Sequence, residues 1–169
     1  MNNPAIAIRV ALPGDHDLVT SILVAAYAKL DDGSYDRGRL TDALPLMSSA
    51  NPRLLASGTY FVAMSDGEPA GCGGWTLEAP GTGAVEPGTG HIRHFATHPD
   101  HLRKGVAQAL LQRCLDDARA AGVTRMKSQS TLPAQKFYAS AGFSKVRDIE
   151  VAMGPAAVLP AVDMELRLD

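Results

Sequence analysis

Residues 90–111 read GHIRHFATHPDHLRKGVAQALL, and this stretch decides the fold that we expect. Its first part, 92–97, mixes apolar and polar residues in the manner of a short strand. Pro99 ends that strand, because proline has no N–H to donate to a ladder of hydrogen bonds. A basic turn follows, and from Val106 apolar residues recur every three or four positions, which predicts a helix that ends before Gly122. The predicted unit is strand, basic turn and helix.

The turn between this strand and helix is suited to an anion. The first turn of a helix has free N–H donors and the positive end of the helix dipole. Gly105 and Ala107 leave the backbone accessible, and the basic pair Arg103 and Lys104 precedes them. A phosphate or pyrophosphate is the expected ligand, and an ordinary connection with two solvated basic residues is the alternative. The GxxxxGK[ST] of a P-loop and the GxGxxG of a dinucleotide fold are both absent from the turn.

The turn resembles the pyrophosphate loop of the GNAT superfamily, the acyl-CoA-dependent N-acyltransferases, which reads Q/R-x-x-G-x-G/A. Its last three positions are matched by Gly105, Val106 and Ala107. Two positions differ: Leu102 stands where the family usually has Gln or Arg, and Arg103 stands where glycine is common. One side-chain contact to the phosphate is therefore missing, and Arg103 or Lys104 is left to supply the positive charge.

A second segment, 130–143, reads STLPAQKFYASAGF and is similar to the family's N-x-x-A-x-x-F/L-Y-x-x-x-G-F. The positions on pattern are Ala134, Phe137, Tyr138, Gly142 and Phe143. Thr131 replaces the usual Asn but keeps a short polar side chain suited to a helix N-cap. The two segments have the right order and separation, and the resemblance extends over 60–143.

Composition limits the class of protein. The 169 residues are 46% hydrophobic, which predicts one domain over residues 1–169 with a proper core. The net charge of −2 gives no sign of affinity for nucleic acid or for a membrane surface. Cys72 and Cys114 have no metal-binding spacing, so we expect no metal site. The chain has neither an apolar run of membrane length nor the pattern of a signal peptide, and we expect a cytoplasmic protein.

The remaining pattern gives the order of elements. We predict strands at 5–10, 59–64, 69–77, 92–97, 125–130, 146–153 and 162–168. Helices are predicted at 15–30, 106–121 and 133–141, and 34–50 forms either a weaker helix or a helix plus a loop. A loop holding Gly154, Pro155 and Pro160 joins the last two strands. Gly71, Gly73 and Gly74 inside a strand indicate a bulge or a close approach of another group.

The resemblance makes this α/β (α+β) pattern the GNAT fold. That fold is a mixed, mostly antiparallel sheet of about seven strands flanked by about four helices. In it, the strands near 92–97 and 126–130 splay apart, and the pantetheine arm of the cofactor fills the gap. The two helices within 15–50 would lie over the acceptor site, where Tyr27, Tyr35 and Asp36 either line a pocket or lie at the surface.

The resemblance also implies the site residues. Backbone groups around Phe95, Ala96 and Thr97 would pair with the pantetheine arm and polarise the thioester. The pyrophosphate would be held by Arg103, Lys104, Gly105, Val106 and Ala107. Ala134 and Phe137 are assigned to the same cofactor site, and Tyr138 occupies the position of the general acid that protonates the leaving sulfur.

The general base is open among several groups. His91 stands where some family members have a catalytic Glu, and histidine can accept a proton near neutral pH. His94 would face the other side of the sheet if the strand were regular. Glu78, at the end of the preceding strand, is a third candidate, and a chain of water molecules without one essential base is a fourth.

These residues predict an N-acetyltransferase that moves an acetyl group from acetyl-CoA to a primary amine. The acceptor is open among peptide N-termini, lysine side chains, polyamines, aminoglycosides, amino acids and small foreign amines, and the resemblance allows a homodimer through the C-terminal strands. Two alternatives remain at this stage: a non-catalytic acyl-CoA sensor on the same fold, and a nucleotide-binding protein that uses only the basic turn.

Overall fold

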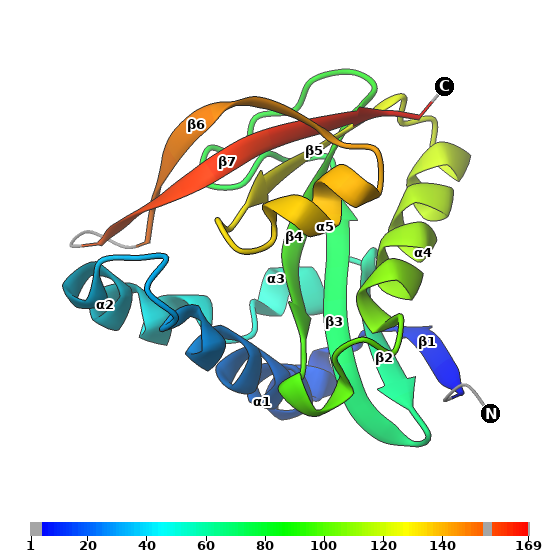
Figure 1. The fold of residues 1–169 in the computed structure, drawn as a ribbon. Coiled ribbons are helices and arrows are strands. Elements are labelled where there is room, and N and C mark those ends of the chain that lie inside the picture. The colour runs from blue at the N-terminus through cyan, green and yellow to red at the C-terminus, as the bar shows by residue number, and fades with distance from the viewer. Residues whose placement is uncertain (1–4, 154–156, 169) are drawn as a thin grey trace.

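The computed structural model describes residues 5–153 and 157–168, and its centre is one seven-stranded sheet (Figure 1). The strand order is β1-β2-β3-β4-β5-β7-β6. The strands are β1 (Ile6–Val10), β2 (Tyr60–Ser65), β3 (Glu68–Thr76), β4 (Thr89–Thr97), β5 (Arg125–Ser130), β6 (Ser144–Ala152) and β7 (Val158–Arg167). All neighbours are antiparallel except β4 and β5. The predicted mixed, mostly antiparallel sheet is therefore confirmed.

Within the described residues, five helices flank the sheet where about four were predicted. They are α1 (His16–Tyr27), α2 (Arg37–Met47), α3 (Pro52–Leu55), α4 (Val106–Ala120) and α5 (Gln135–Ser140). The unpredicted one, α3, is too short to show a helical period; Asn51 caps it and Pro52 occupies its first turn. In the part of the chain that the structure describes, no helix is both long and apolar enough to cross a membrane.

The two faces of the sheet carry separate apolar cores. On one face α4 and α5 pack over a core that includes Phe61, Ile92 and Leu110. The indole Nε1 of Trp75 on β3 donates to Asp117 on α4 at 2.8 Å, which ties helix to sheet. On the other face α1 and α3 cover a second core, to which Ala96 belongs. Ile92 and Ala96 would share a face in a regular strand, so their places in opposite cores show that β4 departs from strict alternation between them.

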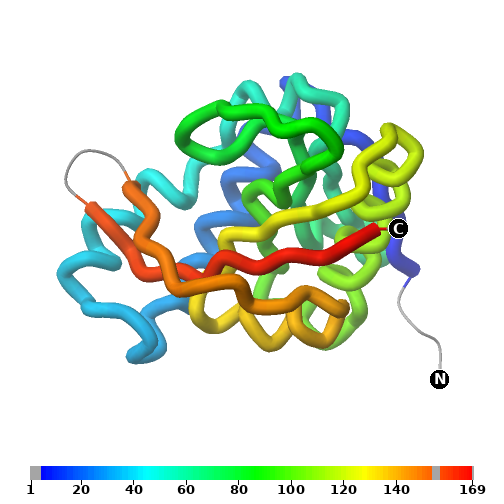
Figure 2. The backbone as a smooth tube through the Cα atoms, turned by 90° about the horizontal axis from the view of Figure 1, so that it is seen from above, coloured from blue at the N-terminus to red at the C-terminus, as the bar shows by residue number. Residues whose placement is uncertain are grey.

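Helix α2 lies beside the start of β7 (Figure 2), and a third apolar cluster joins the two segments. Its buried members are Leu30, Tyr35, Leu40, Ala43, Met47, Ala157 and Leu159. Pro160 lies in β7 opposite Glu150, not in the predicted loop. A proline is tolerated there because the pairing with β5 ends at Ser130 and Val162, before Pro160 is reached. Gly154 and Pro155 lie outside the described residues.

The sheet opens between β4 and β5. Their parallel pairing covers only three residue pairs, which place Thr89–His91 beside Arg125–Lys127. Beyond these pairs β4 remains joined to β3, and β5 remains joined to β7. Two strands that meet at one end and separate at the other leave a wedge in the middle of the sheet.

A bulge in β4 lies next to this opening. The register of β3 and β4 shifts between Cys72 and Gly74, so His94 and Phe95 together stand opposite Gly73. A Cβ at Gly73 would collide with the ring of Phe95. The predicted reading of the strand glycines, a bulge with a close approach, is confirmed at this position.

We expect the substitution Gly73→Ala to destabilise the protein, because its methyl group must displace the Phe95 ring. Overpacking of this kind costs about 1–3 kcal/mol, which for a chain of this size corresponds to a fall in Tm of roughly 2–12 °C. Gly14→Ala is the matched control, since no atom lies within 4 Å of a Cβ there. Thermal unfolding checks both variants, and equal Tm values for the two would contradict the packing role of Gly73.

Candidate active site

A cleft of about 700 Å³ lies where β4 and β5 separate. It is walled by β4, β5, α5, the ends of α1 and α2, and the end of β6. Seven residues that the sequence analysis assigned to the site line it: Phe95, Ala96, Thr97, Ala107, Ala134, Phe137 and Tyr138. The fold therefore brings the two sequence segments, 90–111 and 130–143, to opposite walls of one cavity.

The bulge decides which side chains of β4 reach the cleft. His94 has a φ of +51°, an uncommon left-handed conformation for a residue with a side chain. Its carbonyl accepts a hydrogen bond from the Tyr60 hydroxyl at 2.8 Å, and the carbonyl of Phe95 accepts one from the Tyr27 hydroxyl at 3.1 Å. With the extra residue, His94 turns toward α1 and α2. The expectation that His94 faces the side of the sheet opposite to His91 applies to a regular strand, and the bulge makes this strand irregular.

The basic turn before α4 has the form of an anion site. Arg103 and Gly105 both adopt positive φ, +62° and +83°, so the chain curls around the start of the helix. No side chain caps α4, which leaves the N–H groups of its first turn free of a capping bond. Arg103 and Lys104 are exposed beside it, and Val106 is buried, so Val106 can contribute only its backbone. The turn itself is not part of the cleft lining, but Ala107 in the first turn of α4 is.

Tyr138 on α5 is buried in the wall of the cleft. Its ring contacts Phe137 and Phe143, with centroids 5.1 and 5.3 Å apart. Burial raises the pKa of the Tyr138 phenol far above its usual range. The hydroxyl therefore keeps its proton at neutral pH and can donate it only to a strongly basic partner, such as a leaving thiolate.

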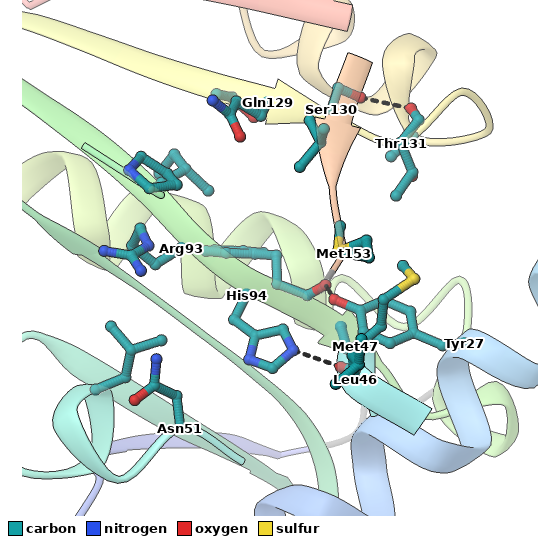
Figure 3. Close-up of a pocket in the computed structure, with 18 of the residues that line it drawn as sticks. Tyr27, Leu46, Met47, Asn51, Arg93, His94, Gln129, Ser130, Thr131 and Met153 are labelled. Atoms are coloured by element: carbon teal, nitrogen blue, oxygen red, sulfur yellow. Dashed lines mark hydrogen bonds between the residues drawn. The ribbon is translucent and has the colours of Figure 1, made fainter. Parts of the chain in front are cut away.

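His94 supplies a neutral imidazole to the same cleft (Figure 3). Its Nε2 lies 2.6 Å from the carbonyl oxygen of Met47. A carbonyl only accepts, so Nε2 carries the hydrogen and Nδ1 keeps its lone pair. Burial lowers the pKa of His94, partly offset by the bond to Met47 and reinforced by nearby Arg93. The ring also stacks on Tyr27, with centroids 5.9 Å apart. The result is a fixed ring with one nitrogen able to accept a proton.

His91 and Glu78 lie elsewhere. His91 lines a smaller adjoining cavity of about 260 Å³, and Glu78 lines neither cavity. Burial lowers the pKa of His91, and Lys127 and Arg93 lower it further. Of the candidate bases in the sequence analysis, His94 is therefore the one whose side chain belongs to the large cleft.

The structure also places four further residues that the sequence analysis discussed. Tyr27 lines the cleft, whereas Tyr35 is buried outside it and its hydroxyl accepts from the backbone N–H of Leu132 at 2.8 Å. Asp36 is exposed and caps α2 through the N–H of Arg39. Thr131 is not the N-cap of α5, because that helix begins at Gln135 and is preceded by Ala134; Thr131 lines the cleft instead.

Several cleft residues carried no sequence signal. They include Met47, Asn51, Arg93, Gln129 and Met153, which reach the cavity from α2, the loop before α3, β4, β5 and the residue after β6 (Figure 3). None of them stands at a matched position of either motif, so nothing in the sequence singled them out.

Comparisons with known proteins agree with this geometry. A family model described as acetyltransferase (GNAT) family matches residues 24–143. A curated relative, the uncharacterized N-acetyltransferase YsnE of Bacillus subtilis, is 33% identical over 90 residues, which are 50% of this chain and 55% of that protein. The chain thus spans about half the length of this curated relative.

Solved structures share the fold over nearly the whole chain. A GCN5-related N-acetyltransferase from Rhodopseudomonas palustris superposes with a TM-score of 0.77 at 21% identity, covering 99% of this chain and 97% of that one. The PaiA N-acetyltransferase from Thermoplasma acidophilum, solved in complex with coenzyme A, superposes with a TM-score of 0.72 at 13% identity, covering 96% and 99%. At sequence identities this low, the similarity to these two structures shows a shared fold.

Proposed function

Because the chain belongs to the GNAT family of acetyltransferases, we propose that it moves an acetyl group from acetyl-CoA directly to a primary amine. The observation that carries this proposal is the content of one cleft. A buried tyrosine hydroxyl, a neutral histidine and the irregular edge of β4 line it together. This combination supplies a proton donor, a proton acceptor and backbone hydrogen-bonding groups within one cavity, which is what acyl transfer to an amine requires.

The residues present fit acetyl-CoA. The wedge between β4 and β5 exposes backbone groups of Phe95, Ala96 and Thr97 that β5 does not pair, because the β4–β5 ladder ends at His91. The start of α4 has no capping side chain, and two exposed cations stand beside it. A long ligand with an amide-rich arm and a pyrophosphate matches these two features, with Arg103 and Lys104 at the phosphate end. When bound, acetyl-CoA supplies the acetyl thioester.

The chain's own groups then manage charge and protons. A backbone N–H at the bulge donates to the thioester oxygen as negative charge grows there. His94 Nδ1 accepts one proton from the attacking amine, and the Tyr138 hydroxyl gives one to the departing sulfur. A new N–C bond to the acetyl carbon replaces the broken C–S bond, so an amide and the free thiol of CoA are the products. Return of the proton from His94 through solvent to Tyr138 resets both groups.

Tyr138→Phe separates proton donation from packing. Phenylalanine keeps the ring contacts with Phe137 and Phe143, so we expect the Kd of acetyl-CoA to change by less than about threefold. Loss of the general acid lowers kcat about 10²-fold to 10⁴-fold. Stopped assays of CoA release and calorimetric titration measure the two quantities. Tyr35→Phe is the matched control because Tyr35 lies outside the cleft, and an unchanged kcat in Tyr138→Phe would remove the acid role.

His94→Gln and His91→Gln identify the proton acceptor. We expect His94→Gln to lower kcat about 10²-fold or more, and His91→Gln to have a much smaller effect, because His91 lies in the adjoining cavity. In the unmodified protein kcat should fall only below about pH 6.5, the ordinary pKa of histidine, since burial lowers the pKa of His94 and keeps it neutral above that value. A larger loss in His91→Gln, or a pH profile that His94→Gln leaves unaltered, would transfer the role to another group.

A further inference from the structure

The charges that line the large cleft are few and unequal in burial. Among the described residues, the formally charged side chains of the lining are Arg93 and Glu150. Glu150 is exposed on the edge strand β6, where water solvates it. Arg93 is half-buried on β4, beside His94. The cleft therefore offers one partly desolvated positive charge and no buried negative one.

Arg93 has no anionic partner at contact distance. Its Nη1 donates to the Thr76 hydroxyl at 2.9 Å, and no carboxylate of the described residues lies within 4 Å of it. Burial lowers the pKa of Arg93, and the charge of Glu78, at longer range, opposes this. The guanidinium stays charged at any working pH, so it remains a half-buried cation with unused donors.

The smaller adjoining cavity does not neutralise Arg93, because its own charges are balanced. It shares five lining residues with the large cleft, namely Pro80, Ile92, Ser128, Gln129 and Glu150. Two cations of its lining, Lys127 and Arg147, lie 3.8 and 3.7 Å from the buried carboxylate of Asp163. Glu150 also lines this cavity, so the two cations are matched by two carboxylates, of which Asp163 is buried and Glu150 is exposed. Arg93 is thus the one cation near the boundary of the two cavities that lacks a carboxylate partner at contact distance among the described residues.

The bulge sets Arg93 next to the proposed proton acceptor. Adjacent residues of a regular strand point to opposite faces, yet Arg93 and His94 both line the cleft. The side chains of both are visible in the cavity in Figure 3. A cation and a neutral base on neighbouring residues match a molecule whose acid group and amine are likewise close together.

From these observations we infer that the acceptor is a small amine that carries a carboxylate, as a free amino acid does, and that Arg93 binds this carboxylate while the amine faces His94. This inference rests on the proposed function and narrows its substrate class. Arginine suits the role because its planar fork of donors binds a carboxylate through two parallel hydrogen bonds. A polycationic acceptor such as a polyamine requires negative charge in its binding site, whereas the partly buried charge of this cleft is positive.

The test compares each amino acid with its own carboxamide. The standard L-amino acids, the matching L-amino acid amides and spermidine are offered with acetyl-CoA, and release of the CoA thiol is followed. We expect at least one free amino acid to be acetylated with a kcat/KM about tenfold or more above that of its amide, because the amide leaves the guanidinium without its anion.

Variants locate the preference. Arg93→Gln should raise the KM for the amino acid about tenfold to a hundredfold, with kcat and the KM for the amide little changed, and Arg93→Lys should recover part of the loss. Arg39→Gln is the matched control, because Arg39 is exposed on α2 and lies outside both cavities. A KM effect without a kcat effect separates a binding role from a general loss of structure.

The results that would contradict the carboxylate-binding role of Arg93 differ from those that would contradict the proposed function. Three results would each overturn the inference alone. The first is that amides or spermidine are acetylated as well as free amino acids, and the second is that the preference for the free acid survives Arg93→Gln. The third is that the protein binds acetyl-CoA but acetylates none of these acids. Failure to bind acetyl-CoA in calorimetry would overturn the proposed function and the inference with it.

Discussion

The bulge at His94 and Phe95 is the constraint on which the rest of the site depends. A left-handed conformation at a residue with a side chain costs roughly 1–2 kcal/mol, so neighbouring groups must hold it. Two tyrosine hydroxyls from different elements do so by donating to the carbonyls of the two bulged residues. Gly73 leaves the space that the Phe95 ring fills. The irregular backbone is thus fixed by the surrounding packing.

The functional geometry follows from this local irregularity. One extra residue in β4 interrupts its alternation, so His94 joins Arg93 on the acceptor side while Phe95 packs on the side of α4. The same strand loses its pairing with β5 beyond His91, which opens the sheet. The proposed reaction uses three features: the cleft between the strands, the basic start of α4, and a half-buried cation beside a neutral histidine.

Local patterns were sufficient to predict most of the fold. Alternation and helical periodicity placed all seven strands and four of the helices, and the glycines of β3 indicated the bulge. The four-residue α3 has no period to detect. Pro160 was placed in a loop because nothing in the local sequence shows that the pairing of β7 with β5 stops at Val162 and leaves Pro160 without a β5 partner. For the site, the motifs predicted the part that would bind the cofactor, because residues close together in the sequence form it. The acceptor half is assembled from residues distant in sequence, such as Met47 and Met153, and the orientation of His94 depends on a register shift that strict alternation cannot represent.

The central claim is that the wedge between β4 and β5 accommodates the pantetheine arm of acetyl-CoA. Calorimetric titration of the protein with acetyl-CoA, CoA and ADP in parallel tests it most directly, because ADP retains the pyrophosphate and lacks the arm. We expect acetyl-CoA and CoA to bind with similar Kd values and ADP at least about tenfold more weakly, since the arm adds buried contact area and backbone hydrogen bonds. Equal binding of ADP and CoA, or no binding of acetyl-CoA, would contradict the account.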